Sequence, residues 1–392
     1  MTSLRSFRVV AAAAALLVSS GAAAQDTLRS AQHDYKLVTV AEGLSIPWGL
    51  AFLPGGDILV TERPGRLRVV RGGKLLPTAV TGVPRVAAGG QGGLMDVVAH
   101  PQFATNRFVY LTYSKPAADG KRNTTAVIRG KFQNDALTDV QELLEANAWS
   151  EGQGHFGSRI AFDGKGYMFV TIGDRQVLPA GDLTKHPAQD LSVHNGKVLR
   201  LHDDGKVPTD NPFVGKAGVL PEIWSYGHRN MQGLIVHPTT GDVWLHEHGP
   251  QGGDELNRAE AGKNYGWPVV GFGVMYRTGA AIHAGTMGEG FTAPTHIWVP
   301  SIGPSGLAYY TGSAFPGWKN SFLVGGLAGE MLVRLTMDGT RVTNVEQLVQ
   351  RRGRIRDVRQ GPDGLVYVAF ESREQGATTT IAKLEPVTRS GS

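Results

Sequence analysis

Basic and amide side chains are concentrated in two short stretches. The segment "SYGHRNMQG" places Arg229, Asn230 and Gln232 within four positions, and Arg354 and Arg356 alternate in "RIRD". Guanidinium groups hold carboxylates through two parallel hydrogen bonds, and amides add further donors. We therefore predict a site for a compact polyanion. The alternatives are a turn that caps its own backbone and, for the alternating arginines, a solvated basic face of a strand.

Glycine-rich segments surround two further polar residues. Gln91 lies in "GGQGGLMD" and His155 lies in "GQGHFGSR". Glycine lets the backbone approach a flat ligand closely, so we place both residues at the same candidate site. A core histidine whose ring is satisfied by the backbone is the alternative interpretation of His155.

Other catalytic patterns are missing from the sequence. His246 and His248 are two positions apart, which is not the helical spacing of zinc ligands. No nucleophile elbow of the type GxSxG and no dinucleotide fingerprint after a strand are found.

A repeated phrase indicates which elements position these residues. A short apolar strand, a turn rich in Pro, Gly or Asp, and a second apolar strand recur at uneven intervals with long insertions between them. Repeated hairpins are typical of a β-propeller, so we predict an all-β fold with six blades and long inter-strand loops over one end of a central channel. A pair of β-sandwiches is the alternative. The six copies span residues 47–63, 94–114, 158–175, 232–249, 305–327 and 356–372.

The propeller would bring distant residues together. Gln91, His155, Arg229 and Arg354 each lie at the start of a different copy. Loops at one end of a propeller face a common channel mouth, so these side chains are expected to share one rim. The long loop 277–297 is expected to shape access to that rim.

The first residues have the pattern of an export signal. A basic start, "MTSLRSFR", precedes the apolar run "VVAAAAALLV" and the small residues of "GAAAQ". The run is too short to span a bilayer, so we predict that residues 1–24 are a signal peptide cleaved near Ala24. An anchor that is never cut is the alternative. The mature protein, residues 25–392, is expected to be a single propeller domain in the periplasm or secreted.

Composition excludes other classes. The formal charge is +5, of which Arg5 and Arg8 of the signal contribute two, and no block of Lys or Arg suggests a nucleic-acid partner. No later segment is apolar enough to span a membrane. The chain has 53 glycines and no cysteine, so disulfides do not hold it together. The sequence leaves monomer and homodimer open.

Taken together and in order, the motifs identify a family resemblance. "WSYGHRNMQGL", "EHGPQGGDELN", "GKNYGWP" and "RIRD" resemble the soluble aldose sugar dehydrogenases that depend on pyrroloquinoline quinone (PQQ), the glucose/sorbosone dehydrogenase group. The resemblance covers nearly all of the mature chain. It implies a six-bladed propeller with PQQ at the channel mouth. The implied PQQ contacts are Gln91, Arg229, Asn230, Gln232, Tyr276, Arg354 and Arg356.

The resemblance also implies the metal and the reaction. Ca²⁺ would bind PQQ and the carbonyls of Gly249 and Pro250, and a second Ca²⁺ would use Glu255 and the main chain near Tyr265. Calcium prefers oxygen ligands, and "GPQGGDE" offers them without His or Cys. His155 would act as general base while hydride passes from C1 of an aldose to PQQ, giving a lactone. Electrons would then leave to an external acceptor.

The sequence departs from the family pattern at one position. It also leaves two alternative functions open. The lysine that the family places near the quinone corresponds to Ala328 in "GGLAGEM". Trp298 is expected either to cover the cofactor or to be plain core. A calcium-dependent propeller lactonase would keep the metal without needing three arginines. A non-catalytic propeller that binds sugar or protein would need no base.

Overall fold

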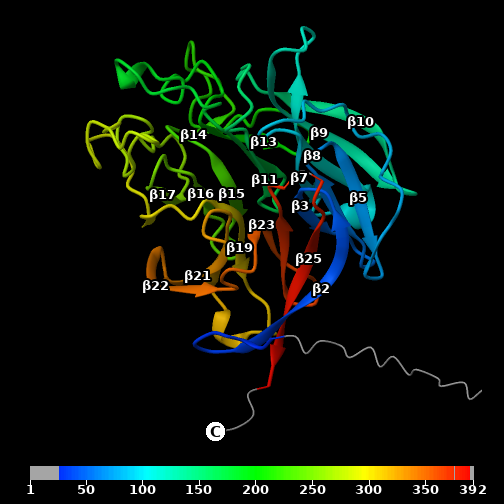
Figure 1. Ribbon diagram of the computed structural model, residues 1–392. Coiled ribbons are helices and arrows are strands. Elements are labelled where there is room, and N and C mark those ends of the chain that lie inside the picture. The colour runs from blue at the N-terminus through cyan, green and yellow to red at the C-terminus, as the bar shows by residue number, and fades with distance from the viewer. Residues whose placement is uncertain (1–25, 375, 389–392) are drawn as a thin grey trace, which may run out of the picture.

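The computed structural model describes residues 26–374 and 376–388, so the predicted signal peptide lies outside the described part. Six antiparallel sheets surround a central channel, and their inner strands contact one another in a closed ring (Figure 1). This arrangement confirms the predicted six-bladed β-propeller. The short helical elements of the described residues are α1 (Phe103–Asn106), η1 (Leu183–Lys185) and η2 (Pro316–Trp318).

Each repeated phrase forms the two inner strands of one blade, with the first strand of each pair next to the channel. The pairs are β3 (Pro47–Phe52) with β4 (Ile58–Glu62), β7 (Leu94–Ala99) with β8 (Phe108–Pro116), β11 (Gly157–Phe162) with β12 (Tyr167–Ile172), β15 (Met231–Val236) with β16 (Val243–Glu247), β19 (Pro304–Tyr310) with β20 (Ser321–Gly326), and β23 (Arg354–Gln360) with β24 (Val366–Glu371).

Outer strands complete the blades, and the sequence analysis did not predict them individually. They are β5 (Arg66–Arg71), β6 (Lys74–Leu75), β9 (Asn123–Gln133), β10 (Ala136–Glu145), β13 (Lys197–His202), β14 (Ile223–Tyr226), β17 (Asp254–Arg258), β18 (His296–Trp298), β21 (Met331–Asp338) and β22 (Arg341–Leu348).

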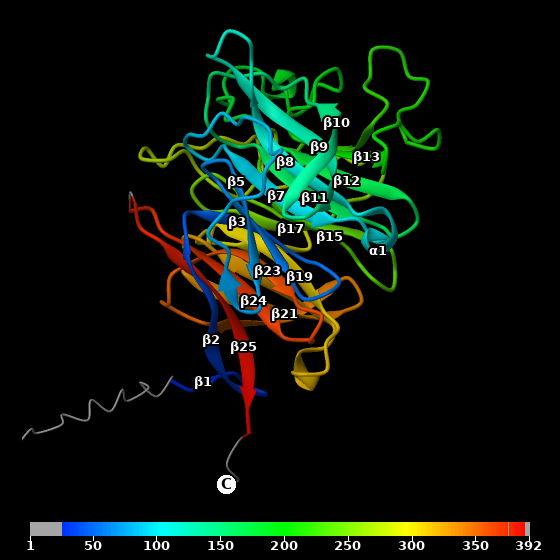
Figure 2. The same ribbon diagram turned by 90° about the vertical axis from the view of Figure 1, so that its right-hand side faces the viewer.

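The two ends of the described chain close the ring in one sheet. Strand β2 (Asp34–Leu44) pairs antiparallel with β25 (Thr379–Val387), with Leu37 opposite Leu384. The short β1 (Leu28–Arg29) adds to the edge, so the sheet runs β1-β2-β25-β24-β23. The blue β2 lies beside the red β25 in both views (Figures 1 and 2). Strands from both ends of the chain therefore share one blade.

The apolar core lies between blades. Six clusters of buried side chains each join the facing surfaces of two neighbouring sheets. Inner strands are covered on both faces, which is why β4 and β12 read as nearly continuous apolar runs rather than alternating ones. Trp298 belongs to one of these clusters, so it is core and does not cover the cleft.

A buried arginine at the centre connects all the blades. Arg159, on β11, donates from Nε to the Gln232 carbonyl at 2.7 Å, and its guanidinium lies 4.2 Å from the ring of Trp48. Its Nη1 lies 3.2 Å from Asp96 and 3.0 Å from Asp357, and Nη2 donates to the Ser305 carbonyl. These five partners lie on the inner strands of the other five blades: Trp48 on β3, Asp96 on β7, Gln232 on β15, Ser305 on β19 and Asp357 on β23.

The direction of the inner strands determines the end of the channel at which the polar loops lie. All six inner strands begin at the same end of the channel, so the residues before them and the residues after the second strands meet there. Across residues 26–374 and 376–388, no helix is long and apolar enough to cross a bilayer.

Candidate functional site

Two cavities share a wall at the channel end where the inner strands begin. The first, about 810 Å³, is lined by Arg63, Arg354 and Arg356 and is called the arginine lobe. The second, about 740 Å³, is lined by His155 and Arg229 and is called the histidine lobe. The residues common to both lobes are Gln91, His248, Pro250 and Tyr276. The propeller therefore brings together the distant residues that the repeat predicts.

The arginine lobe has an apolar wall. Trp48 of β3, Met95 of β7 and Phe156 before β11 form a separate buried cluster, and all three line this lobe. Aromatic rings beside charged groups suit a ligand that is flat and polyanionic. The lobe therefore combines a stacking surface with cations.

Arg354 and Arg356 lie on one face of β23 and share one carboxylate partner. Arg354 donates from Nε and Nη2 to Glu371 Oε1 at 3.2 and 2.9 Å, and Arg356 donates from Nε to Glu371 Oε2 at 2.7 Å. Burial raises the pKa of Glu371, but Arg356 and then Arg354 outweigh it and hold that pKa at about 2. The pair is not a solvated basic face, because Arg356 is only 6% exposed.

Two amide side chains lie next to these arginines: Gln232 contacts Arg356, and Asn230 contacts Gln232. Gln232 lines the arginine lobe, accepts from Arg356 Nη1 at 3.1 Å and donates to the Gly157 carbonyl. Asn230 is buried behind it, outside the residues that line either lobe. Its Oδ1 accepts from Gln232 Nε2, whereas its buried Nδ2 has no hydrogen-bond partner in the described structure. A buried amide without an acceptor is costly, so an acceptor supplied by a ligand would stabilise this site.

His155 is held by a carboxylate in the histidine lobe. Its Nδ1 lies 2.6 Å from Asp174 Oδ1, and its backbone N–H donates to Gln91 Oε1 at 2.8 Å. Asp174 also accepts from Trp267 Nε1 at 2.8 Å. His155 has φ 48°, a left-handed conformation that is uncommon outside glycine and that often marks functional residues. These contacts fix the imidazole ring, so Nε2 is the ring nitrogen that can interact with a ligand in the histidine lobe.

Electrostatics keeps this histidine neutral and its partner charged. Burial lowers the pKa of His155 below 6.5, the charge of Arg229 lowers it further, and Asp174 opposes both. Burial raises the pKa of Asp174, but His155, Arg229 and the Gln176 N–H outweigh it, so that pKa lies below 3.8. An ionised Asp174 only accepts, so Nδ1 carries the proton and Nε2 carries the lone pair of a base.

Arg229 spans the wall between the lobes. Its Nη1 donates to the Gly249 carbonyl at 2.6 Å and to that of His248 at 3.1 Å, and its guanidinium lies 5.1 Å from the ring of Trp267. Tyr276, which is 57% exposed, donates to the Pro250 carbonyl at 3.0 Å. The two carbonyls predicted to bind Ca²⁺ thus face the cleft but already accept hydrogen bonds.

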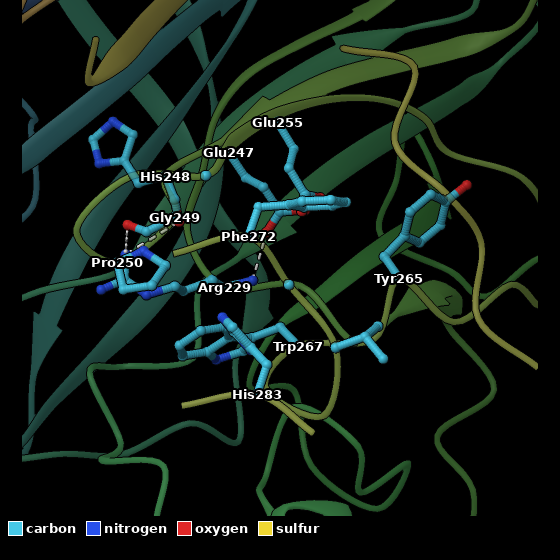
Figure 3. Close-up of a pocket in the computed structure, with 14 residues that line it drawn as sticks. Arg229, Glu247, His248, Gly249, Pro250, Glu255, Tyr265, Trp267, Phe272 and His283 are labelled. Carbon is cyan, nitrogen blue, oxygen red and sulfur yellow. Dashed lines mark hydrogen bonds between the residues drawn. The ribbon is translucent and has the colours of Figure 1, made fainter. Parts of the chain in front are cut away.

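A buried carboxylate, Glu247, and a half-buried one, Glu255, lie side by side next to this wall. Glu247 of β16 and Glu255 of β17 are opposite each other in the sheet (Figure 3). Both line a small cavity of about 20 Å³ with Tyr265, and Asn257 Nδ2 donates to both. Burial and then the charge of Glu247 raise the pKa of Glu255 well above 4.5. Like charges opposite each other destabilise a sheet unless a cation or a proton compensates.

Four functional residues were not predicted individually from the sequence. Arg63, Asp174 and Glu371 line the lobes at or just after the ends of second strands. Glu247, the last residue of β16, lines the small cavity. Their signal was available in "TERP", "IGDR", "LHEH" and "FESR". His228 of the first quoted stretch is structural, because it lies fully buried between Glu247 and Ser225.

A metal cluster built from side chains is not found in the described chain. No group of three or more His, Cys, Asp or Glu side chains of residues 26–374 and 376–388 is arranged to hold an ion. Any cation here would depend partly on backbone carbonyls, as the sequence predicts for Gly249 and Pro250.

Fold and cleft together define a propeller enzyme with a histidine–carboxylate pair and clustered guanidinium groups. The family model of glucose/sorbosone dehydrogenase matches residues 44–379. The chain therefore belongs to the glucose/sorbosone dehydrogenase family, and the predicted class, an oxidoreductase, is confirmed.

One relative and two solved structures illustrate this membership. Aldose sugar dehydrogenase YliI of Escherichia coli (strain K12) is 42% identical over 331 residues, covering 83% of this chain and 87% of the relative. The apo crystal structure of the soluble aldose sugar dehydrogenase of Escherichia coli has a TM-score of 0.83 at 38% identity, covering 90% of this chain and all of that chain. A PQQ-bound aldose sugar dehydrogenase from Streptomyces coelicolor has a TM-score of 0.73 at 28% identity and covers 91% and 99%.

Proposed function

We propose that this protein is a periplasmic quinoprotein that oxidises aldose sugars at C1 to lactones with PQQ as cofactor. One observation carries the proposal. The neutral His155, paired with Asp174, opens onto the same cleft as the guanidinium groups of Arg229, Arg354 and Arg356. A base beside clustered cations suits proton removal from a sugar next to a polyanionic redox cofactor.

The arginine lobe fits PQQ by its chemistry. PQQ is flat and carries three carboxylates, and the lobe offers the apolar cluster of Trp48, Met95 and Phe156 together with several guanidinium groups. The unpartnered Nδ2 of Asn230 provides a further donor nearby. When bound, PQQ would supply the quinone that accepts the hydride from the sugar.

The residues of the histidine lobe would manage the proton. His155 Nε2 would accept the proton of the C1 hydroxyl, and Asp174 would hold the ring in the tautomer that leaves Nε2 free. The Trp267 indole fixes Asp174 in turn. Because burial and Arg229 lower the pKa of His155, the ring is already deprotonated at neutral pH.

The residues fit calcium at two places. Carbonyl oxygens of Gly249 and Pro250 suit a hard cation, which would act as a Lewis acid beside PQQ. Each of these carbonyls already accepts a hydrogen bond, from Arg229 or Tyr276, and would bind the ion through its second lone pair. At the second place, Glu255, Glu247 and the chain at Tyr265 line a cavity of about 20 Å³, which has the volume for one water or ion.

Reconstitution tests the proposal directly. The purified protein is mixed with PQQ and Ca²⁺, an aldose and a dye acceptor, and dye reduction is followed; we expect turnover that requires PQQ. His155→Ala should lower turnover by about 10²-fold or more while PQQ binding remains. Turnover that survives this substitution would exclude His155 as the base.

The alternative functions give different results in the same assay. Opening of a lactone without dye or PQQ would indicate a lactonase. Sugar binding with no dye reduction in the PQQ-loaded protein would indicate a non-catalytic propeller. Either result would refute the proposed function.

A further inference from the structure

Arg63 differs from the other buried arginines of the cleft. It directly follows β4 and lines the arginine lobe, where it is partly buried. Its backbone is fixed on both sides, because its N–H donates to the Ile46 carbonyl at 3.0 Å and its carbonyl accepts from the Leu94 N–H at 3.1 Å. The side chain therefore projects from a rigid position at the edge of the central channel.

The guanidinium of Arg63 has unused hydrogen-bond donors. In the described structure it forms no hydrogen bond and no ion pair with any residue of 26–374 or 376–388. Burial lowers the pKa of Arg63; Glu371 raises it, while Arg356 and Arg354 lower it further. These three charged residues are therefore its electrostatic neighbours, yet Glu371 contacts only the other two.

The neighbouring arginines have few free donors. Arg354 uses Nε and Nη2 on Glu371 and donates from Nη1 to the Leu327 carbonyl at 2.8 Å. Arg356 uses Nε on Glu371 and Nη1 on Gln232. Glu371, whose pKa is about 2, is ionised and supplies the negative charge for this pair. Glu371 offsets only one of the two positive charges of this pair, but both arginines are held by hydrogen bonds, whereas the Arg63 guanidinium has no side-chain partner in the described part of the chain.

We propose that Arg63 is a principal carboxylate-binding residue of the arginine lobe and holds one carboxylate of PQQ with a bidentate pair of hydrogen bonds. This inference rests on the proposed function. A partly buried guanidinium with free parallel donors is well suited to a carboxylate, and its unshared charge offsets the cost of bringing an anion beside Glu371. In this proposal, Arg354 and Arg356 keep their contacts with Glu371, and they contribute to PQQ binding mainly through their positions in the arginine lobe.

The test measures binding rather than turnover. PQQ is titrated into the full-length apo protein with Ca²⁺ present, by isothermal titration calorimetry, for wild type, Arg63→Gln, Arg63→Lys and Arg373→Gln. Arg373 is the matched control, because it lines the same lobe but is exposed to solvent. Thermal melts of the apo proteins show whether each variant is folded.

The expected affinities separate a bidentate contact from general electrostatics. Arg63→Gln should weaken PQQ binding by about 10- to 100-fold, and Arg63→Lys should recover only part of the loss. Arg373→Gln should weaken it by less than about threefold, because solvent and salt screen an exposed charge. The folded Arg63→Lys protein keeps the test valid if the glutamine variant does not fold.

Three results would overturn the inference. Unchanged affinity in Arg63→Gln would show that Arg63 does not bind the cofactor. Equal losses in the Arg63 and Arg373 glutamine variants, or full recovery with lysine, would show that charge alone matters. A wild-type protein that takes up no PQQ would refute the proposed function itself, which distinguishes that failure from the failure of Arg63.

Discussion

At the scale of single residues, the cleft is organised by pairing between charges. Glu371 forms ion pairs with both Arg354 and Arg356, and Asp174 holds His155. Each carboxylate lies at or just after the end of a second strand, whereas its partners lie at or just before the start of an inner strand. The side chains available to a ligand are those left over from this pairing, chiefly Nε2 of His155 and the guanidinium of Arg63.

The pH dependence of turnover follows from the pairing of His155. The base that we propose, His155, must be deprotonated, and its pKa lies below 6.5, so the acid limb of kcat/KM should fall below pH 6.5 in the wild type. Asp174→Asn removes a charge that raises this pKa, so the limb should move to still lower pH. It should also lower kcat by about 10²-fold or more, because the tautomer is no longer fixed.

Rate profiles between pH 4 and 8, measured on PQQ-loaded protein, check this expectation. Asp119→Asn is the control, since Asp119 lies in an exposed turn with Arg122. A limb that moves toward higher pH in Asp174→Asn would contradict the assignment of the pair.

At the scale of elements, close packing of the inner strands brings the loops to one cleft. Gly306 of β19 lies against β23, and a Cβ atom at Gly306 would overlap the backbone of Asp357 and Val358. Ser305, the residue before it, donates to the Ile355 carbonyl at 2.6 Å. Glycine is needed here to let two strands approach, not to adopt a left-handed turn.

Gly306→Ala should therefore destabilise the propeller. Overpacking between two fixed strands costs about 1–3 kcal/mol, so the urea midpoint should fall clearly. Gly285→Ala is the matched control, since its new Cβ would meet only the Met287 carbonyl at 3.4 Å. Equal midpoints for the two variants would mean that β19 and β23 can separate without cost.

At the scale of the whole molecule, the blades are joined at the edge and at the centre. The pairing of β2 with β25 closes the ring, and Arg159 contacts the inner strand of every other blade. Arg159 also lies beneath the arginine lobe, because it donates to the carbonyls of Gln232 and Arg356, which line that lobe. Stability and the shape of the arginine lobe thus depend on one buried cation.

Arg159→Met should destabilise the fold strongly. Removing one partner of a buried ion pair typically costs about 3–5 kcal/mol, and here Asp96 and Asp357 would keep Arg359 as their one cationic partner in the described structure. The midpoint of thermal or urea unfolding measures the loss. Arg341→Met serves as control, because the exposed pair of Arg341 with Asp338 is worth at most about 1 kcal/mol. Comparable midpoints for the two variants would show that the central network does not hold the blades.

The fold and the types of residue in the cleft can be predicted from the amino-acid sequence alone. Six hairpins repeat in the chain, and strand period and turn residues are local properties, so the blades and their order follow from the sequence. The same local order placed Gln91, His155, Arg229 and Arg354 at one end of the channel. The outer strands and the pairing of β2 with β25 have weaker local patterns.

Only the tertiary structure decided how those residues are used. It pairs Arg354 and Arg356 with Glu371, occupies the Gly249 carbonyl with Arg229, and leaves Arg63 without a partner. Each of these contacts joins the ends of two neighbouring strands of one blade. Which charged groups meet depends on distances of a few ångströms between strand ends and on the direction of each side chain, and no spacing along the chain encodes those distances.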